Sequence, residues 1–437
     1  MSLLLGIDLG TSYLKAGVFD FTGKLRGLGR VATGVREPRP GWKELEAREL
    51  LEHLREAVTA ALLESGCAAS EVAAISYGSQ ANTFLLLDER NRPITPLIFW
   101  HDRRAESLAG ELRDFGSSET RRRRTGLWDL VPESAPAKLL WIARHSPEVW
   151  QQCRSVMTVS DYLTFFLTGE RVGDASTASL TGLYDLTKGE WWSDALGRFG
   201  LAPSQLSVPL QPGAVAGRLT SEAAAFFQLG AGTKVAAGAL DHHAAAMGSG
   251  LGAQVEASLS SGTVLAAMVL GSEILPMPDC IWGPHPGELK HYALAYDPGG
   301  AGRLEDYQKR FAPEVTVGEL LGCLESGEGR LHETHGEALR GHLRDIAQTE
   351  RSLLEKISPG KRFSRIAATG GGARGLVSLQ IKADVLGVPV MSTSPEPACL
   401  GAAVLASVGS GVHENLECAI VRMIHSERVA YPNGVGA

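Results

Sequence analysis

The chain lacks the features that mark several classes of protein. Its 437 residues include six cysteines, none of them paired in a CxxC arrangement, so neither a zinc ribbon nor a redox motif is indicated. No apolar run is long enough to span a membrane. The net charge of −7 argues against a nucleic-acid-binding protein. The N-terminal residues enter a strand without a basic leader, so we expect no signal peptide and a cytoplasmic protein.

What the sequence does contain is typical of a globular protein with a large core. Hydrophobic residues make up 44% of the chain and charged residues 21%. The length predicts two or three domains, and a new unit that begins near Gly230 leads us to predict domains at residues 1–229 and 230–437. The only basic run is Arg121–Arg124, and such a run usually lies on a solvated face.

The first twenty residues are predicted to form a strand, a tight turn and a second strand. The apolar run Leu3–Ile7 is interrupted by Asp8, and Gly10-Thr11-Ser12 precedes the second run, Tyr13–Phe19. Backbone N–H groups and hydroxyls in such a turn suit a polyphosphate, and the carboxylate can hold a hydrated Mg²⁺. An ordinary hairpin with Asp and Gly as turn residues explains the motif equally well.

The second half of the chain contains the same pattern. Val255–Leu259 and Thr263–Leu270 are predicted as a strand pair around Ser260–Thr263, which suggests duplicated domains that face each other across a cleft. Gly370–Gly372 joins a buried strand to the predicted helix Leu376–Leu386. Glycine there permits close approach of a ligand, and a helix N-terminus favours phosphate. A flexible connection is the alternative interpretation.

An acid ends the predicted strand Val235–Leu240. Asp241 is therefore expected at the carboxyl edge of a sheet, where α/β folds place their ligands. Its carboxylate could accept a hydroxyl proton during phosphoryl transfer, or it could cap the following helix. His242 and His243 are not expected to bind a metal together with Asp241, because adjacent helical positions point about 100° apart.

Polar and aromatic side chains follow strands of the first half and suggest a site for a polyhydroxylated ligand. Each has a plain alternative, since a tryptophan is often core and an Asp–Arg sequence is often a surface pair. These residues are Gln80, Asn82, Trp100, Asp102 and Arg103.

Helices and irregular stretches alternate along the rest of the chain. Ala47–Ser65 and Ala338–Ile357 carry apolar residues at helical spacing. Arg171–Leu186 is rich in Ser, Thr, Gly and Asp and is predicted to be an ordered loop that faces a site. Pro276–Gly302 is predicted to be a loop because of its glycines and prolines.

Taken in order, these motifs resemble the FGGY family of carbohydrate kinases, with xylulokinase-like spacing, within the actin–hexokinase–Hsp70 superfamily. The resemblance extends from about Leu3 to about Val408, and the joint order of the motifs makes it specific although each one alone is weak. The matching segments are Gly6–Thr11 and Ser261–Thr263 (phosphate motifs), Gly78–Asn82 and Phe99–Arg103 (sugar segments), Pro136–Trp141, Ser160–Leu163, Asp174–Ala178, Gly238–Asp241 (the catalytic aspartate) and Gly370–Gly387 (the adenosine motif).

The resemblance implies an α/β fold of two ribonuclease H-like (actin-like ATPase) domains, with mixed β-sheets flanked by helices and an active-site cleft between them. It implies ATP-dependent, Mg²⁺-assisted phosphorylation of a ketose or polyol hydroxyl, with Asp241 as general base and Asp8 and Asp241 at the metal. The implied nucleotide-binding residues are Gly10, Thr11, Ser12, Lys15, Gly262, Thr263, Gly371, Gly372 and Ala373. The implied substrate-binding residues are Gln80, Ala81, Asn82, Trp100, Asp102, Arg103 and Asp241. The expected partner is a small-molecule sugar, with no nucleic acid and no membrane, and a homodimer is left open.

Two departures from the family pattern concern the substrate and the second domain. Ala81-Asn82-Thr83 stands where xylulokinases have Met-His-Gly, which predicts an altered sugar contact. The stretch between Thr263 and Thr369 is shorter than usual, and it motivates an alternative in which the chain is a catalytically weak sugar sensor. An actin- or Hsp70-like ATPase acting on proteins shares the phosphate turns but does not explain Gln80 or Gly238–Asp241.

Overall fold

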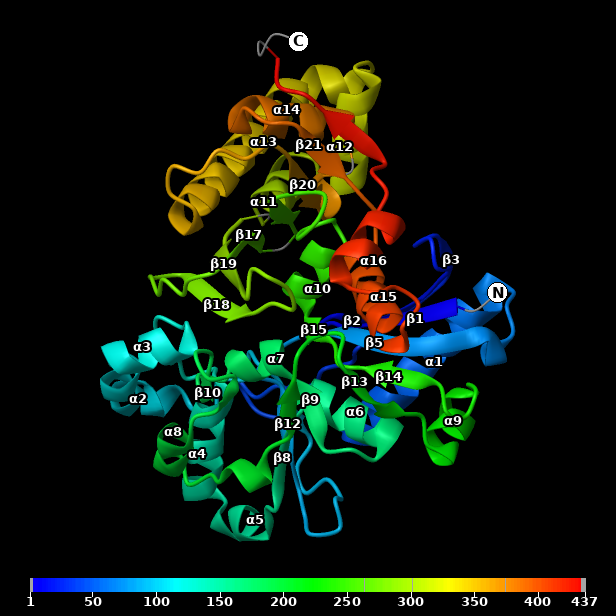
Figure 1. The fold of residues 1–437 in the computed structure, drawn as a ribbon. Helices are drawn as coiled ribbons and strands as arrows, with labels where there is room; N and C mark the ends of the chain where they lie inside the picture. The colour runs from blue at the N-terminus through cyan, green and yellow to red at the C-terminus, as the bar shows by residue number, and fades with distance from the viewer. Residues whose placement is uncertain (1–2, 263, 301, 374, 434–437) are drawn as a thin grey trace.

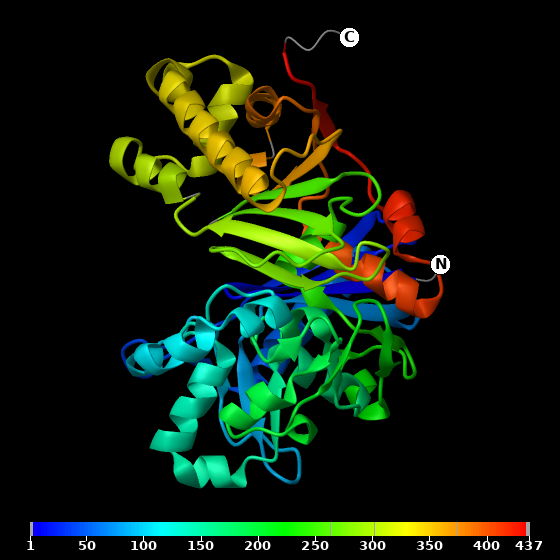
Figure 2. The same cartoon turned by 60° about the vertical axis from the view of Figure 1, so that its left-hand side comes forward.

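The protein is built as two lobes, the first formed mainly by the N-terminal half of the chain and the second mainly by the C-terminal half (Figure 1). The structure is a computed structural model that describes residues 3–262, 264–300, 302–373 and 375–433. Each lobe has a mixed β-sheet flanked by helices, and Figure 2 shows the second sheet lying above the first. The predicted α/β fold of two actin-like domains is therefore confirmed.

The sheet of the first lobe begins with the predicted opening motif. β1 pairs antiparallel with β2 and parallel with β5, and β1 continues through Asp8 to Leu9. In sheet order its strands are β13 (Val215–Arg218), β14 (Lys234–Ala236), β5 (Val72–Ser79), β1 (Leu3–Leu9), β2 (Tyr13–Phe19) and β3 (Leu25–Ala32), with the short β15 (Ala239–Leu240) also on β5.

The sheet of the second lobe repeats this pattern. β16 pairs antiparallel with β17 and parallel with β20, as β1 does with β2 and β5. Helix α1 (Ala47–Ser65) packs on β2 and β3, and helix α13 (Arg330–Ile357) packs on β17 and β19 in the same way. The strands in order are β18 (Cys280–Pro284), β19 (His291–Asp297), β17 (Leu265–Gly271), β16 (Ala257–Ser261), β20 (Ile366–Thr369), β21 (Val390–Ser392) and β22 (Arg428–Ala430).

The last long helix of the chain packs on the sheet of the first lobe. Residues of α15 (Pro397–Ser410), including Cys399 and Ala403, share a buried cluster with Leu4 and Phe19. A Cβ added at Gly6 would lie 1.9 Å from the carbonyl oxygen of Cys399, so only glycine permits this contact. The chain thus passes between the lobes more than once. The boundary predicted at residue 230 falls between β13 and β14, which pair with each other in the first sheet.

Further elements surround these two sheets. A small sheet in the first lobe contains β4 (Glu44–Leu45), β7 (Leu97–Ile98), β6 (Phe84–Leu87) and β8 (Ser155–Thr158), and β11 (Glu190–Trp191) and β12 (Val208–Leu210) form short pairs with β10 and β9. The other helices of the first lobe are α2 (Ala109–Gly116), α3 (Glu119–Thr125), α4 (Ala135–His145), α5 (Pro147–Gln152), α6 (Val159–Thr168), α8 (Ser193–Arg198) and α9 (Ser221–Phe227). Those that follow are α10 (Asp241–Met247), α11 (Gly302–Phe311), α12 (Val317–Ser326), α14 (Leu376–Leu386) and α16 (Leu416–Met423). No helix in the described ranges is long and apolar enough to cross a bilayer.

Two stretches predicted as loops contain regular structure. Arg171–Leu186 holds β9 (Val172–Asp174), α7 (Ala175–Ser179) and β10 (Tyr184–Asp185), and Pro276–Gly302 holds β18 and β19. Both predictions were wrong for the same reason. The short strands are stabilised by pairing with distant partners, such as β19 with β17 and β9 with β12, and local composition does not reveal those partners.

The basic run also differs from the prediction at one position. Arg121 is fully buried, and its guanidinium donates hydrogen bonds to the carbonyl oxygens of Gly116, Leu127 and Trp128 at 2.8–3.1 Å. Arg123 is exposed and pairs with Glu119, as expected for a solvated face. Arg121 therefore holds together the chain segments before and after α3, at Gly116 and at Leu127 and Trp128.

Candidate active site

Two aspartates lie at the carboxyl edge of the first sheet. Asp8 on β1 is in register with Gly78 on the neighbouring strand β5. Gly78 is in turn in register with Ala239 on β15. Asp241 follows β15 directly and is the first residue of α10. A Cβ added at Gly78 would be 3.6 Å from the Cα of Asp241. Glycine at this place lets the start of α10 come close to the sheet, and the Asp241 carboxylate is near enough to raise the pKa of Asp8.

Asp8 belongs to a charged group that includes a residue not predicted from the sequence. Its Oδ2 lies 3.7 Å from Lys15 Nζ, and Lys15 Nζ donates a hydrogen bond of 2.7 Å to Oε2 of Glu396. Burial raises the pKa of Asp8 to about 7; the charge of Lys15 opposes this shift, whereas Asp241 and Glu396 add to it. Burial lowers the pKa of Lys15, but Glu396 and Asp8 outweigh it and raise that pKa above its usual value.

The predicted phosphate turns connect the strands at the cleft. Gly10 begins the first turn, and a Cβ there would be 2.6 Å from the carbonyl oxygen of Tyr13. Thr33 anchors this turn because its N–H donates to the carbonyl oxygen of Ser12 and its hydroxyl to that of Gly10, both at 3.0 Å.

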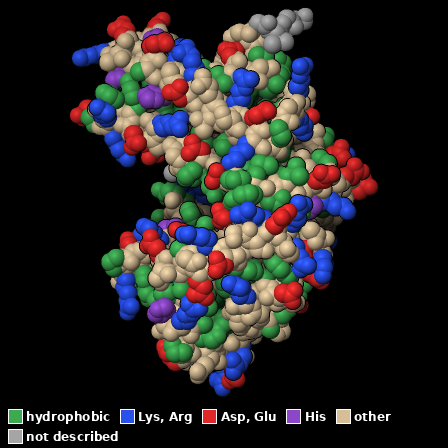
Figure 3. Space-filling view, turned by 90° about the vertical axis from the view of Figure 1, so that its left-hand side faces the viewer, with side chains coloured by type: hydrophobic (Ala, Val, Ile, Leu, Met, Phe, Trp, Pro, Cys, Tyr) green, Lys and Arg blue, Asp and Glu red, His purple; other side chains and the backbone are tan. Residues whose placement is uncertain are grey.

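The molecular surface is hollowed between the lobes (Figure 3).

The turns of the second lobe lie against each other. Ser260 on β16 is in register with Thr369 on β20. Gly370 has a φ of +87°, and a Cβ there would be 2.6 Å from the carbonyl oxygen of Ser261. The turn Gly371–Ala373 is thereby held beside Gly262. Thr263, predicted to bind phosphate, lies outside the described residues.

A hydrogen-bonded chain links the first phosphate turn to the predicted sugar segment. The indole N–H of Trp100 donates to the hydroxyl of Thr11 at 2.8 Å, and this hydroxyl faces Oε1 of Gln80 at 3.4 Å. Thr83 donates to the same Gln80 oxygen at 2.9 Å. Gln80 is 3% exposed, and its buried Nε2 has no hydrogen-bond partner among the described residues. The Nε2 of Gln80 thus has two N–H donors without a partner among the described residues, while its oxygen accepts two hydrogen bonds.

Asn82 is occupied by contacts within the protein. Its φ is +59°, in the left-handed region that asparagine tolerates. The side-chain amide donates to the carbonyl oxygen of Leu180 at 3.1 Å and accepts from the N–H of Ala135 at 2.9 Å. Ala81 beside it is 8% exposed. The asparagine therefore shapes the sugar segment from within.

Asp102 and Arg103 likewise have protein partners. Asp102 is fully buried, and its carboxylate accepts from the Arg104 guanidinium at 2.8 Å and from the Lys43 N–H at 2.6 Å. Burial raises the pKa of Asp102, but the hydrogen bonds and charge of Arg104 outweigh it and hold the pKa below its usual value. Arg103 pairs with Glu106 at the surface, at 2.6 Å. In this conformation neither side chain joins Gln80 and Trp100 at the cleft.

A buried lysine supports the sugar segment and was not predicted. Lys138 on α4 is fully buried, and its Nζ donates to the carbonyl oxygens of Asn82, Phe99 and Trp100 at 3.1, 2.7 and 3.3 Å. The sequence does contain a signal for this role, namely a single lysine among the apolar residues of a predicted helix. Three acceptors match the three donors of an ammonium group, so this residue ties together both loops of the predicted sugar site.

The two histidines after Asp241 point to different surroundings. His243 is fully buried, and its Nε2 lies 2.9 Å from Nδ1 of His285. Burial lowers the pKa of His243 well below its usual value. The His242 N–H donates to Oδ1 of Asp241 at 2.7 Å. Within the described residues no group of three His, Cys, Asp or Glu side chains is arranged to hold a metal.

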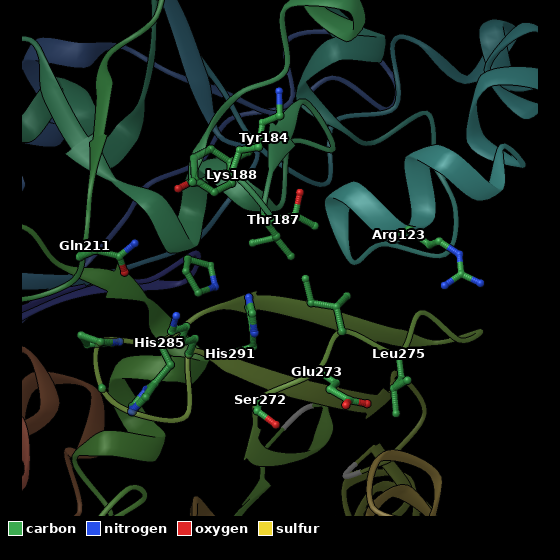
Figure 4. A pocket seen from close by; sticks show the side chains of 17 residues that line it. Arg123, Tyr184, Thr187, Lys188, Gln211, Ser272, Glu273, Leu275, His285 and His291 are labelled. Carbon is green, nitrogen blue, oxygen red and sulfur yellow. The ribbon is translucent and has the colours of Figure 1, made fainter.

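A cavity of about 960 Å³ lies at a different place, between the β10–β11 hairpin and the loops at the ends of β17, β18 and β19. Figure 4 shows Tyr184 and Thr187 on one side and His285, His291 and Ser272 on the other. None of the predicted site residues lines it. β17 runs from Leu265, near the phosphate turn, to Gly271 at this cavity, a span of roughly 20 Å at about 3.4 Å per residue. The cavity therefore lies about one strand length from the phosphate turn of the second lobe.

A duplicated sheet with a glycine-containing turn at the cleft in each lobe defines the actin-like class of ATPase fold. The N-terminal domain model of the FGGY family of carbohydrate kinases matches residues 3–248, and the C-terminal domain model matches residues 289–410. The chain belongs to this family and is a sugar kinase, which confirms the resemblance drawn from the motifs.

The relatives extend this likeness over the whole chain. The L-xylulose/3-keto-L-gulonate kinase of Escherichia coli (strain K12) is 27% identical over 468 residues, covering 98% of this chain and 92% of that protein. The xylulose kinase of Lactococcus lactis is 26% identical over 473 residues, covering 99% and 93%. The crystal structure of xylulose kinase from Rhodospirillum rubrum matches with a TM-score of 0.86 at 25% identity, covering 99% of this chain and 94% of that one. The chain is thus xylulokinase-like in sequence and fold.

Proposed function

We propose that the chain transfers the γ-phosphoryl group of ATP to a hydroxyl of a ketose or polyol, with a xylulose-like sugar as the substrate class. One observation carries the proposal. Asp8 near the end of β1 and Asp241 just after β15 lie at the same edge of the sheet, on either side of β5, and Asp241 is close enough to raise the pKa of Asp8. One carboxylate can serve the phosphates and the other the sugar hydroxyl, and phosphoryl transfer needs both within one cleft.

Asp241 is the proposed general base. It is half-buried, and one of its oxygens accepts from its neighbour's N–H, whereas no described residue hydrogen-bonds to the other oxygen. That free oxygen can accept the proton of a sugar hydroxyl as the oxygen of that hydroxyl attacks the γ-phosphorus. The two lobes on either side would exclude water, which protects ATP from hydrolysis.

The donor set fits Mg²⁺ together with a nucleotide. Mg²⁺ in kinases is bound by one or two carboxylates, with phosphate oxygens and water completing the shell. Asp8 and Asp241 supply two carboxylates, and no third acid joins them as a ready-made cage in the described residues. When bound, the ion would draw charge from the phosphates. Lys15, Gly10 and Ser12 are proposed at the β/γ-phosphates, with Gly262, Gly371, Gly372 and Ala373 on the side of the second lobe.

For the sugar we propose direct contacts from Gln80, Trp100 and Asp241. The unpaired Nε2 of Gln80 is a buried donor that a substrate oxygen would satisfy, and Trp100 is 44% exposed at the cleft. Thr11 would act as the link between the two sites, since its hydroxyl already bonds Trp100 and faces Gln80. Asn82, Asp102 and Arg103 would shape the site through their protein contacts.

The test is a screen of ketoses and polyols for sugar-dependent ADP release, made with the wild-type chain and Asp241→Asn. We expect one group of sugars to stimulate ADP release, and D241N to lose it by about 10²–10⁴-fold while ATP binding by calorimetry is kept. Asp279→Asn, at an exposed pair with Lys356, is the matched control and should behave as wild type. Full turnover in D241N would refute the base assignment, and sugar binding without any ADP release would favour the sensor alternative.

A further inference from the structure

Glu396 lies in an unusual place for an acid that contacts the cleft. It stands between Pro395 and Pro397, directly before α15, 381 residues after its partner Lys15 in the sequence. The two prolines restrict the backbone on either side of it. Its N–H also lies 3.3 Å from the hydroxyl of Ser394. The backbone at Glu396 is therefore held in a defined conformation that does not depend on its side-chain contacts.

The side chain does not serve its own helix. Glu396 occupies the N-cap of α15, but it makes no side-chain capping hydrogen bond, which is the usual structural role of a polar residue there. It reaches instead to β2 and accepts a hydrogen bond of 2.7 Å from Lys15 Nζ. The carboxylate is 14% exposed. Helix capping therefore does not explain why a glutamate stands at this position.

Lys15 lies between two carboxylates. It is opposite Asp8 in the β1–β2 pair, and its Nζ is 2.7 Å from Glu396 but 3.7 Å from Asp8. The closer pair is the charge-assisted hydrogen bond. Without Glu396, the ammonium would turn to Asp8 and neutralise the carboxylate that the proposed function assigns to Mg²⁺.

We propose that Glu396 is a positioning residue of the kinase reaction. It holds the ammonium of Lys15 toward the nucleotide phosphates and away from Asp8. This inference rests on the proposed function, because it assumes that Lys15 contacts phosphate. The first lobe's phosphate site is then complete only when the start of α15, contributed by the end of the chain, is docked on the sheet.

The test is a double-mutant cycle between Glu396→Ala and Lys15→Met, read by calorimetric binding of ATP in the absence of sugar and with Mg²⁺ present. Each single variant should weaken ATP binding by about tenfold, whereas the double variant should be no weaker than K15M alone, because Glu396 acts through Lys15. Glu396→Gln keeps a hydrogen-bond acceptor without the charge and should recover part of the loss. The KM for sugar should change less than twofold, and the melting temperature of E396A should stay near that of wild type.

Glu111→Ala breaks an exposed pair with Arg144 and is the matched control, expected to bind ATP as wild type does. The inference is overturned if E396A binds ATP normally while K15M does not, or if the two effects simply add. The proposed function fails in a different way, through wild-type protein that binds no ATP or K15M that binds it unchanged.

Discussion

At the scale of single residues, the buried ammonium of Lys138 carries a large desolvation cost. Moving a charge out of water is costly unless hydrogen bonds replace its hydration. The structure supplies three carbonyl oxygens, from Asn82, Phe99 and Trp100. Even so, burial lowers the pKa of Lys138 to about 7. Its protonation state and the shape of the proposed sugar site are therefore coupled.

We predict that Lys138→Met raises the KM for sugar more than the KM for ATP, because the three carbonyls lose their common donor. Stability should also change with pH. The unfolded chain keeps a lysine pKa of about 10.4, so between about pH 7 and 10 the unfolded state binds more protons. The free energy of unfolding should rise with pH in that window because of Lys138, by at most about 1.4 kcal/mol per pH unit.

Urea unfolding at pH 7, 8 and 9 measures this slope in wild type and K138M. The slope should be smaller in K138M, and the exposed Lys361→Met control should keep it. An identical pH slope in wild type and K138M, or a KM effect confined to ATP, would contradict the prediction.

The sequence pointed to some candidate site residues and missed others for a physical reason. Asp8 and Asp241 could be proposed because their signal is local: an acid that interrupts or ends an apolar run of strand length. Glu396 could not, because its partner lies at the other end of the chain. Asn82 and Asp102 were predicted to contact the sugar, but which atoms they contact depends on packing that residue type does not encode.

At the scale of elements, one buried ion pair joins the parts of the second lobe that carry the proposed nucleotide-binding turns. Glu350 on α13 and Lys382 on α14 are 0% and 2% exposed and form a hydrogen-bonded pair. Glu350 also accepts a hydrogen bond of 2.6 Å from the hydroxyl of Ser261. The end of β16 and helix α14 of the proposed adenosine motif are thereby attached to one carboxylate.

We predict that Lys382→Met lowers the free energy of unfolding by about 3–5 kcal/mol, because it leaves Glu350 buried and unpaired. The double variant Glu350→Leu/Lys382→Met should recover most of that stability, since a buried pair can be replaced by apolar side chains. It should still bind ATP more weakly than wild type, because Ser261 has lost its anchor.

Chemical denaturation and calorimetric ATP titration give the two readouts. Lys356→Ala, which breaks an exposed pair with Asp279, should change neither by much. The prediction is wrong if K382M is as stable as wild type, or if the double variant binds ATP normally.

Elements with strong local periodicity were predicted well, and those that depend on pairing were not. The helix Ala47–Ser65 has the predicted bounds and ends at Gly66 in a left-handed conformation. The predicted start of the long helix at Ala338 was too late, because α13 begins at Arg330 and its first turns are largely polar. β18 and β19 were missed because their stability comes from pairing, β19 with β17 and β18 with β19.

At the scale of the whole molecule, the contact between α10 and α15 connects the proposed base to the end of the chain. A Cβ at Gly401 on α15 would be 1.8 Å from the carbonyl oxygen of Ala244, and one at Gly248 would be 1.9 Å from that of Pro397. The two backbones thus touch without side chains between them. Because Asp241 begins α10 and Glu396 precedes α15, this contact sets the spacing of the two acids at the edge of the first sheet.

We predict that Gly401→Ala destabilises the protein by about 1–3 kcal/mol, since an added methyl group must push the two backbones apart. The rate of phosphoryl transfer should fall further than ATP affinity, because the shift moves Asp241 relative to the phosphates and a displacement of about 1 Å can cost about 10²-fold in rate. Gly322→Ala is the matched control. Gly322 also lies within a helix, α12, but a Cβ there meets nothing within 4 Å, so G322A should be neutral or stabilised by up to about 1 kcal/mol. Melting temperatures and single-turnover rates of the two variants decide the matter. If G401A matched G322A in both, the close contact would not control the spacing of the cleft.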